Sequence, residues 1–460
     1  MPFDDTIAAI ATPPGVGGIG IIRISGPLAE TIARLLCRFP KGVIPLKSHQ
    51  LYHGRIISPA TGAILDEALI TLMRKPRSYT GEDLIEIQGH GSPLILEAVL
   101  TEVVRAGARL AAPGEFTRRA FLNNRIDLTQ AEALMGLMTA RTGRGLEIAH
   151  TQLQGALHRR IEALRQSLTE ILATLEAAID FSEDEGERHH PAADAATQLQ
   201  NVIDQIREML STYQEGRMIR EGANAVIIGR PNVGKSSLLN RLLGENRAIV
   251  TAIPGTTRDF IEECIDIRGI AVRLTDTAGL RNPANIIEKE GIDRVWGKLS
   301  TADLIIAVAD GSTPLTGEDY DILEKTRYHS IVPVINKADL DHRLSDREMQ
   351  AWLRDASPLW ISAKTGAGIP ALKDAIYERL TGEQTEQAAG VVITQIRHKT
   401  ALEKTIGHLQ QARESLTNAM SFEFVAFDLR EALDSLGEIV GVTTSEDVLD
   451  RIFSTFCVGK

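Results

Sequence analysis

The chain has 460 residues, 43% hydrophobic and 24% charged, which is too long for one core and predicts about three globular domains. Its formal net charge of −11 excludes a protein that coats nucleic acid by bulk electrostatics, although a local basic face or a basic partner would still permit RNA binding. An acidic start, three cysteines without disulfide or metal-ligand spacing and no apolar stretch of about 18 residues predict a cytoplasmic chain without a membrane helix.

The first 118 residues mix glycine-rich turns with short apolar runs, which is typical of a compact α+β domain. We predict strands over residues 19–24, 68–73 and 84–88, and a helix over 93–106. Glycines between Gly15 and Gly20 lie before their strand, which is the wrong order for a dinucleotide-binding loop.

Helical patterning occupies two separate stretches of the chain. Apolar residues recur three and four positions apart from about 128 to 179, which predicts long amphipathic helices. The acidic segment 182–191 interrupts them, and we interpret His189 and His190 there as a solvated turn, with a ligand role as the alternative.

The same helical patterning resumes at 193–219 and again at about 399–440, on either side of a stretch with a different residue pattern. Each helical arm has an apolar stripe to bury, and the stripe of the other arm is the nearest partner. We therefore predict a discontinuous helical domain with another domain inserted into it. The predicted order is an N-terminal domain at 1–118, helical parts at 119–218 and 382–460, and the inserted domain at 219–381.

The most informative motif is the loop Gly229-Arg-Pro-Asn-Val-Gly-Lys-Ser236, between an apolar run at 225–228 and a helical segment at 237–243. Strand, loop and helix in this order are what a phosphate cradle needs. Its glycines let backbone N–H groups face the phosphates, while Lys235 neutralises charge and Ser236 binds Mg2+. The nucleotide contacts predicted here come from Asn232, Val233, Gly234, Lys235, Ser236 and Ser237.

Two further elements predict contacts to the γ-phosphate and its metal. The loop Pro254-Gly-Thr-Thr-Arg-Asp259 brings Thr257 to Mg2+, and such loops order on GTP and relax after hydrolysis. Asp276-Thr-Ala-Gly279 ends a strand-like run at 272–275, so it places a carboxylate near the metal and a backbone N–H near the γ-phosphate. The contacts predicted from this pair of elements also include Thr277, Ala278 and Gly279.

The last two elements select the base. Asn336-Lys-Ala-Asp339 follows a strand-like run at 331–335, and the Asp339 carboxylate can accept two hydrogen bonds from guanine that adenine does not offer. Ser362-Ala363-Lys364, after 359–361, supplies a backbone N–H for the guanine O6. Each element alone has another interpretation, as a turn, a helix cap or a loop. Five in this order resemble the translation-factor-related GTPases and predict a Ras-like P-loop domain.

Other segments point to a particular family. They span the chain and together resemble the MnmE family, also called TrmE, of tRNA-modification GTPases that act on the wobble uridine. The segments are Asp5-Thr-Ile-Ala-Ala-Ile-Ala-Thr-Pro-Pro-Gly15, Tyr79-Thr-Gly-Glu-Asp83, Gln88-Gly-His-Gly91, Pro113-Gly-Glu-Phe116, Arg119-Ala-Phe-Leu122 and Phe456-Cys-Val-Gly-Lys460.

At the nucleotide, the resemblance implies an unusual catalytic set. Leu280 stands where many signalling GTPases carry a water-orienting Gln, and the family instead uses a glutamate that falls on Glu288. An exposed Glu at a helix start is the alternative interpretation. In place of an arginine finger the family uses K+, and Arg281 is a further candidate for stabilising this region. The implied K+ contacts are Asn232 with backbone groups of Thr251, Ile253 and Thr256.

In the N-terminal domain, the resemblance implies a folate site that takes 5,10-methylene- or 5-formyl-tetrahydrofolate. The matching positions are Arg23, Glu82 and Arg125, with Lys460 from the C-terminus. A carboxylate suits the pterin edge and cations suit the acidic tail. Arg125 stands where relatives often carry Lys, which keeps the charge but changes the geometry. Cys457 fits two interpretations equally, a tucked C-terminal tail or a thiolate that adds to C6 of uridine.

The resemblance further implies a homodimer that works on tRNA with a flavoprotein resembling MnmG, which carries FAD and uses NADH, in a heterotetramer. A ribosome-assembly GTPase is the alternative, but such proteins more often carry an evident basic RNA-binding module. A folate enzyme with an idle GTPase is disfavoured because all five nucleotide elements are intact.

Overall fold

The computed structural model describes residues 4–39, 45–180, 191–245, 264–276, 301–353, 359–382 and 391–460. The chain divides into two compact units. The first comprises Met1–Met135, Gln152–Arg165 and Leu433–Lys460, and the second comprises Gly136–Thr151 and Gln166–Ala432. The predicted domain boundaries remain predictions.

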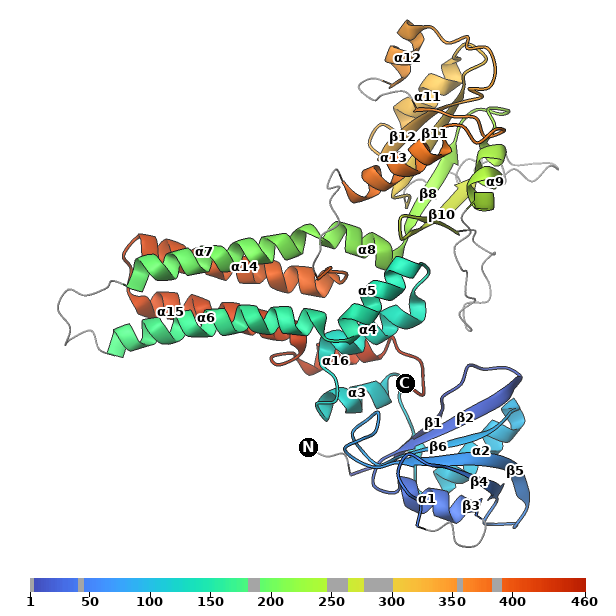
Figure 1. Ribbon diagram of the computed structural model, residues 1–460, viewed down its shortest axis with the longest axis vertical. Coiled ribbons are helices and arrows are strands. Elements are labelled where there is room, and N and C mark those ends of the chain that lie inside the picture. Colours follow the sequence, from blue (N-terminus) through green and yellow to red (C-terminus); the bar gives the residue numbers. More distant parts are fainter. Residues whose placement is uncertain are drawn as a thin grey trace. The chain divides into compact units, whose positions relative to one another are not determined.

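The first unit is built on a seven-stranded sheet in the order β3-β4-β5-β6-β2-β1-β7 (Figure 1). Neighbouring strands are antiparallel except β1 and β7, which are parallel. Helices α1 (Ala29–Leu36) and α2 (Pro93–Arg105) pack apolar side chains onto the sheet, where Ile22, Ile32 and Val99 are buried. The strands are β1 (Ile7–Ile10), β2 (Gly17–Ser25), β3 (Cys37–Arg38), β4 (Leu51–Ile57), β5 (Ile64–Met73), β6 (Leu84–Gly91) and β7 (Arg109–Leu110).

Helices from distant parts of the sequence complete this unit. It contains α3 (Glu115–Leu122), most of α4 (Leu128–Thr139), the start of α6 (Ala156–Asp180), the end of α15 (Phe422–Val440) and all of α16 (Glu446–Phe453). Leu128, Leu449, Phe453 and Phe456 form one buried cluster. Phe456 therefore fixes the C-terminal segment to the helices that follow the sheet.

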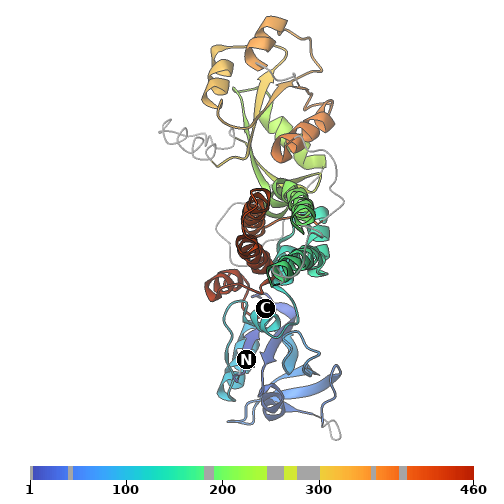
Figure 2. The same ribbon diagram turned by 90° about the vertical axis from the view of Figure 1, so that its left-hand side faces the viewer.

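The second unit contains the helices from both sides of the inserted domain. Helix α7 (Pro191–Ser211) packs against α14 (Ile396–Thr417), and the two lie side by side in both views (Figures 1 and 2). Where the chain returns, the Ile393 N–H donates to Thr212 Oγ1 at 2.9 Å, beside α8 (Tyr213–Glu221). The prediction of a domain inserted between two helical arms is confirmed.

The inserted domain has a six-stranded sheet in the order β13-β12-β11-β8-β10-β9, in which all neighbouring strands are parallel except β9, which is antiparallel to β10. Along β8, Ala225 and Ile227 face one core with Leu238 of α9, whereas Val226 and Ile228 belong to another. A sheet with both faces buried is the expected form for parallel strands. The strands are β8 (Ala223–Ile228), β9 (Cys264–Ile267), β10 (Ile270–Asp276), β11 (Leu304–Asp310), β12 (Ile331–Asn336) and β13 (Leu359–Trp360), and the helices are α9 (Lys235–Glu245), α11 (Gly317–Lys325), α12 (Asp346–Leu353) and α13 (Ile369–Thr381).

Most predicted elements are confirmed, and two differ in detail. The segment 128–179 forms three helices, because the chain turns before α5 (Gly143–Leu153) and again before α6. Gly17, Gly18 and Gly20 belong to β2 itself and do not precede it. Among the described residues, no helix combines the length and the apolar character that crossing a membrane requires.

Candidate nucleotide and N-terminal sites

The phosphate cradle has the backbone that its sequence predicts. Gly234 and Asn232 have φ angles of 95° and 64°, in the left-handed region where glycine is favoured and asparagine is tolerated. The turn they form leads directly into α9, which begins at Lys235. The N-terminal N–H groups of a helix attract phosphate. Asn232, Ser236 and Ser237 are exposed at this end, whereas the Val233 side chain is buried in the core.

Lys235 is buried, and its Nζ donates to the carbonyl oxygens of Gly229 and Arg230 at 2.9 Å each. The Lys235 ammonium group therefore lies against the loop that is expected to hold the phosphates. A bound phosphate would offer Lys235 Nζ negatively charged acceptors, which are stronger than these carbonyl oxygens.

Asn336 connects three of the predicted elements. Its Nδ2 donates to the Val233 carbonyl at 2.8 Å, and its Oδ1 accepts the Ala363 N–H at 3.0 Å. An added Cβ at Gly234 would lie only 2.3 Å from Asn336 Nδ2, so this approach requires glycine. The phosphate cradle and the two base-selecting loops are therefore held together by one buried amide.

The base-selecting carboxylate is positioned by a hydroxyl. Ser362 Oγ donates to Asp339 Oδ1 at 2.7 Å and accepts the Thr365 N–H at 3.1 Å. The Ser362 hydrogen bond lowers the pKa of Asp339, which favours the ionised acceptor that guanine needs. Arg241 of α9 donates to the carbonyl oxygens of Ala363 and Lys364, so the same loop is also fixed from the cradle side.

Lys337 has a partner that the sequence reasoning missed. Its Nζ donates to Asp310 Oδ2 at 2.6 Å, and Asp310 is buried at the end of β11. Burial acts to raise the pKa of Asp310, but the bonds from Lys337 and Ser312 lower it overall. The signal was present in the sequence, because Asp310 ends the apolar run 304–309 just as Asp276 ends its own strand.

Asp276 is the last residue of β10, beside Ile227 of β8. The remaining residues predicted to surround the γ-phosphate lie outside the described residues. These are Thr251, Ile253, Thr256, Thr257, Thr277, Ala278, Gly279, Arg281 and Glu288.

A second candidate site lies in the first unit, where residues from both ends of the chain meet. Arg23 of β2 pairs with Glu86 of β6 at 2.8 Å, and its Nη1 donates to the Gly459 carbonyl at 3.0 Å. Lys460 follows directly, and burial together with the nearby Arg23 lowers its pKa. Cys457 is exposed, although Phe456 before it is buried.

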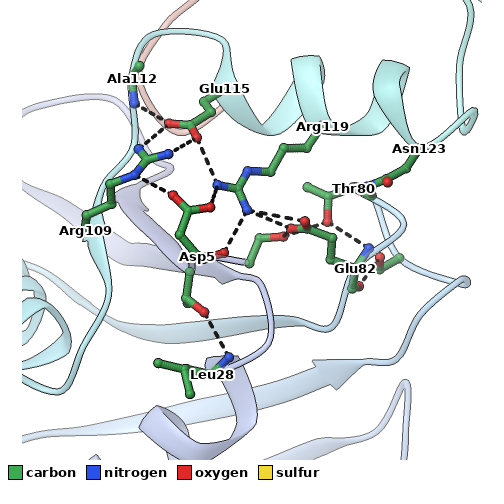
Figure 3. A network of polar contacts seen from close by, with 12 residues as sticks. Asp5, Leu28, Thr80, Glu82, Arg109, Ala112, Glu115, Arg119 and Asn123 are labelled. Atoms are coloured by element: carbon green, nitrogen blue, oxygen red, sulfur yellow. Dashed lines mark hydrogen bonds and ion pairs between the residues drawn. The ribbon is translucent and has the colours of Figure 1, made fainter. Parts of the chain in front are cut away.

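Glu82 belongs to the same site through a buried network (Figure 3). Its carboxylate accepts hydrogen bonds from Ser25 Oγ at 2.7 Å and from Arg119 Nη1 at 3.2 and 3.3 Å. Arg119 is completely buried and also pairs with Asp5 at 2.7 Å and Glu115 at 3.0 Å. Sequence reasoning named Arg119 only within a family segment and not as a site residue, because nothing in a single chain marks which arginine is buried.

Arg125 joins this site through the loop that precedes Glu82. Its Nε donates to the Ser78 carbonyl at 3.1 Å, and Ser78 Oγ donates to the Glu82 carbonyl at 2.5 Å. Tyr79 of the same loop lies under Arg23, with 5.4 Å between the guanidinium carbon and the ring centre. Arg23, Glu82 and Arg125 therefore lie around one loop, and Lys460 lies near Arg23.

The parallel sheet, the phosphate cradle and the guanine-selecting residues define a P-loop GTPase. Two family models match the chain: "MnmE helical domain" over residues 128–457 and "GTP-binding protein TrmE N-terminus" over 6–125. The chain belongs to the MnmE family of tRNA modification GTPases.

Relatives named tRNA modification GTPase MnmE match it from end to end. The protein of Syntrophus aciditrophicus is 53% identical over 99% of both chains. The protein of Heliobacterium modesticaldum is 45% identical over 99% of both, and that of Geobacter sulfurreducens is 44% identical over 100% of both.

Proposed function

We propose that this chain hydrolyses GTP and, with a flavoprotein partner that carries FAD and uses NADH, modifies C5 of the wobble uridine, U34, in tRNA. The added group is of the carboxymethylaminomethyl type, and its first carbon comes from a folate. The observation that supports this most is the cluster in the first unit, where Arg23 and Lys460 lie beside an exposed thiol, Cys457. Because its substrate is tRNA, we place the protein in the cytoplasm.

The residues present fit a reduced folate. Glu82 keeps acceptor capacity on Oε1, whose only bond in the network is the long one from Arg119 at 3.3 Å. A carboxylate with this capacity suits the adjacent N–H groups of a pterin. Arg23, Arg125 and Lys460 supply cations for the carboxylates of the folate tail. A methylene-tetrahydrofolate bound there would supply one carbon at the oxidation level of formaldehyde.

Cys457 has the exposure that a nucleophile needs. In the proposed step its thiolate forms a bond to C6 of the uridine, and the C5–C6 electron pair moves to C5 to give an enolate. C5 would then bond to the methylene carbon as one of that carbon's two bonds to folate nitrogen breaks, with the electron pair and a proton going to the nitrogen, and an amine would later displace the second nitrogen. Loss of the C5 proton and departure of the thiolate restore the double bond and the free cysteine.

For GTP hydrolysis, we propose that K+ offsets charge on the phosphates, with Asn232 supplying a side-chain oxygen from the cradle. Its left-handed backbone and exposed side chain are compatible with this role. Ser236 and Thr257 would hold Mg2+, with Thr251, Ile253 and Thr256 completing the K+ contacts. Glu288 would orient the attacking water, because Leu280 has no hydrogen-bonding group.

A homodimer through the first unit is supported by an uncovered apolar surface. Val16, Ile19 and Leu94 are 92%, 65% and 79% exposed, near the point where Gly17 of β2 pairs with Gly91 of β6. Large apolar side chains gathered at one place mark an interaction surface. A second copy would cover them with the same residues.

The nucleotide part is tested by measuring GTP hydrolysis in KCl and in NaCl at equal ionic strength. We expect a large stimulation by K+ that Asn232→Ala abolishes, and a Glu288→Ala variant that binds GTP but does not hydrolyse it. Equal rates in the two salts would contradict this mechanism.

The folate part is tested by equilibrium binding of 5-formyl-tetrahydrofolate to the full chain. Arg23→Met should weaken binding, whereas Cys457→Ser should bind folate and hydrolyse GTP normally but leave U34 unmodified in a strain that carries only this variant. Normal U34 modification with Cys457→Ser would exclude the nucleophile role and leave the folate site untouched.

A further inference from the structure

The turn between β9 and β10 occupies a sensitive place in the GTPase. It consists of Arg268 and Gly269, with φ angles of 50° and 93°. Strand β9 pairs with β10 alone, as the last strand of the sheet. At the open end of this hairpin, β10 ends at Asp276, the carboxylate that the sequence predicts near the metal. A shift of the turn is therefore carried along β10 toward Asp276.

The closed end of the hairpin is held by residues from outside the GTPase sequence. Thr142 Oγ1, just before α5, donates to the Gly269 carbonyl at 2.7 Å, and both residues are buried. Arg144 on α5 packs against the same turn, because a Cβ added at Gly269 would lie 2.6 Å from the Arg144 Cβ. The glycine is therefore required both for its backbone angle and for this contact.

Further polar contacts fix the same turn. Arg144 pairs with Glu215 of α8 at 3.0 Å, and Tyr377 of α13 donates to the same carboxylate oxygen at 2.9 Å. Arg268 in the turn pairs with Asp374 of α13 at 2.5 Å and lies 5.2 Å from the centre of the Tyr377 ring. The hairpin end is thus connected to α5, α8 and α13 by one continuous network.

The network is important because it includes a short segment, 136–151, that is connected along the chain to the first unit. The segment Gly136–Thr151 is the only part of the described chain before Gln166 that belongs to the second unit. It is joined covalently to the first unit at both ends, at Met135 and at Gln152. Whatever moves α5 therefore acts on the hairpin, and whatever moves the hairpin acts on α5.

We propose that Thr142 and Arg144 are positioning residues for GTP hydrolysis, which act by holding the β9–β10 turn and, through β10, the position of Asp276. The linkage is reciprocal: the nucleotide bound to the GTPase changes the stability of the segment 136–151, and this segment changes the rate of hydrolysis. Neither residue belongs to the nucleotide-binding motifs. The proposal rests on GTP binding alone, and not on the folate step or the tRNA step.

The first test is steady-state hydrolysis of GTP by the full chain. Thr142→Val removes the hydroxyl that bonds the Gly269 carbonyl, and we expect kcat to fall about fivefold or more while KM changes less than about twofold. Thr142→Ser keeps the hydroxyl and should restore the rate. Arg207→Ala is the matched control for Arg144→Ala, because Arg207 makes an exposed ion pair with Asp204 on α7. A wild-type kcat in both Thr142→Val and Arg144→Ala would overturn the proposal.

The decisive comparison of the second test uses the wild-type protein alone. Amide hydrogen exchange over residues 143–151 is compared between the wild-type protein bound to GDP and bound to a non-hydrolysable GTP analogue, each with Mg2+ and K+. We expect the protection to differ, and the difference to disappear in Thr142→Val while the cradle peptides still respond. Identical exchange in the two nucleotide states of the wild type would overturn the linkage, whatever the kinetics show.

Discussion

At the residue scale, selection of the base depends on one carboxylate and the groups that position it. Ser362 bonds Asp339 Oδ1 and leaves Oδ2 for a ligand. Guanine offers an N–H and an amino group to such a carboxylate, whereas xanthine carries a carbonyl at the second position. The choice of nucleotide is therefore decided by whether this side chain only accepts or also donates hydrogen bonds.

Asp339→Asn should weaken GTP binding by more than about tenfold, because a charged hydrogen bond is worth roughly 1.5–3 kcal/mol. The amide can donate to a carbonyl, so binding of xanthosine triphosphate should improve at the same time. Fluorescent-nucleotide titration measures both affinities. Asp341→Asn, an exposed carboxylate two positions away, is the control that should change neither. Equal losses for the two nucleotides would mean that Asp339 does not read the base.

Lys460 gives the N-terminal site a predicted dependence on pH. Burial and the neighbouring Arg23 lower the pKa of Lys460, so it loses its proton at a lower pH than an ordinary lysine. The attraction for an anionic folate tail should then fall as the pH rises through that lowered value. Lys460→Arg should keep the affinity constant over the same range, because arginine remains charged. Titrations of 5-formyl-tetrahydrofolate between about pH 7 and 10 test this, and parallel curves for the two proteins would refute it.

At the element scale, the cradle is a strand, a turn and a helix whose geometry depends on one missing side chain. Gly234→Ala would force a Cβ to within 2.3 Å of Asn336 Nδ2 at a φ of 95°. We expect GTP affinity to fall more than about tenfold, because the cradle and the base-selecting loops must separate. Isothermal titration of GTP measures the loss.

Gly244→Ala provides the control for that substitution. Gly244 lies in α9, the helix that follows Gly234, and an added Cβ there meets nothing within 4 Å. Removing a helix glycine at such a position stabilises by about 0.5–1 kcal/mol. A Gly244→Ala protein that loses GTP as severely as Gly234→Ala would show that the contact with Asn336 is not the cause.

These elements also show what could be read from the sequence. The cradle and the strands before Asp276 and Asn336 were predictable, since their signals are local: an apolar run, a turn motif and a helix pattern. The Asn336 bonds to Val233 and Ala363 were not, because they join loops about 100 and 27 residues away. The pairing of Arg119 with Glu82 was not predictable either. Both residues were named only through the family resemblance, and their pairing depends on how α3 packs on the sheet.

At the scale of the whole molecule, the four residues after Phe456 belong to the first unit. Removing residues 457–460 should abolish folate binding, because the Gly459 carbonyl and Lys460 both lie at Arg23. GTP hydrolysis should stay within about twofold of the full chain, since Phe456 still packs in its cluster and keeps the fold. Folate binding and GTPase rate measured on the same preparation test this. A loss of both activities together would show that the tail supports the GTPase as well.

The pairing of α7 with α14 has a consequence for how the protein is made. Helix α7 ends at Ser211 and α14 begins at Ile396, so the 184 residues 212–395 separate the end of one from the start of the other. At roughly 5–20 residues per second, a ribosome needs on the order of 10–40 s to deliver the missing helix. During that interval the apolar side of α7 is without its partner while the GTPase, a contiguous stretch, can already fold. The newborn chain therefore exposes the apolar side of α7 until α14 has been synthesised.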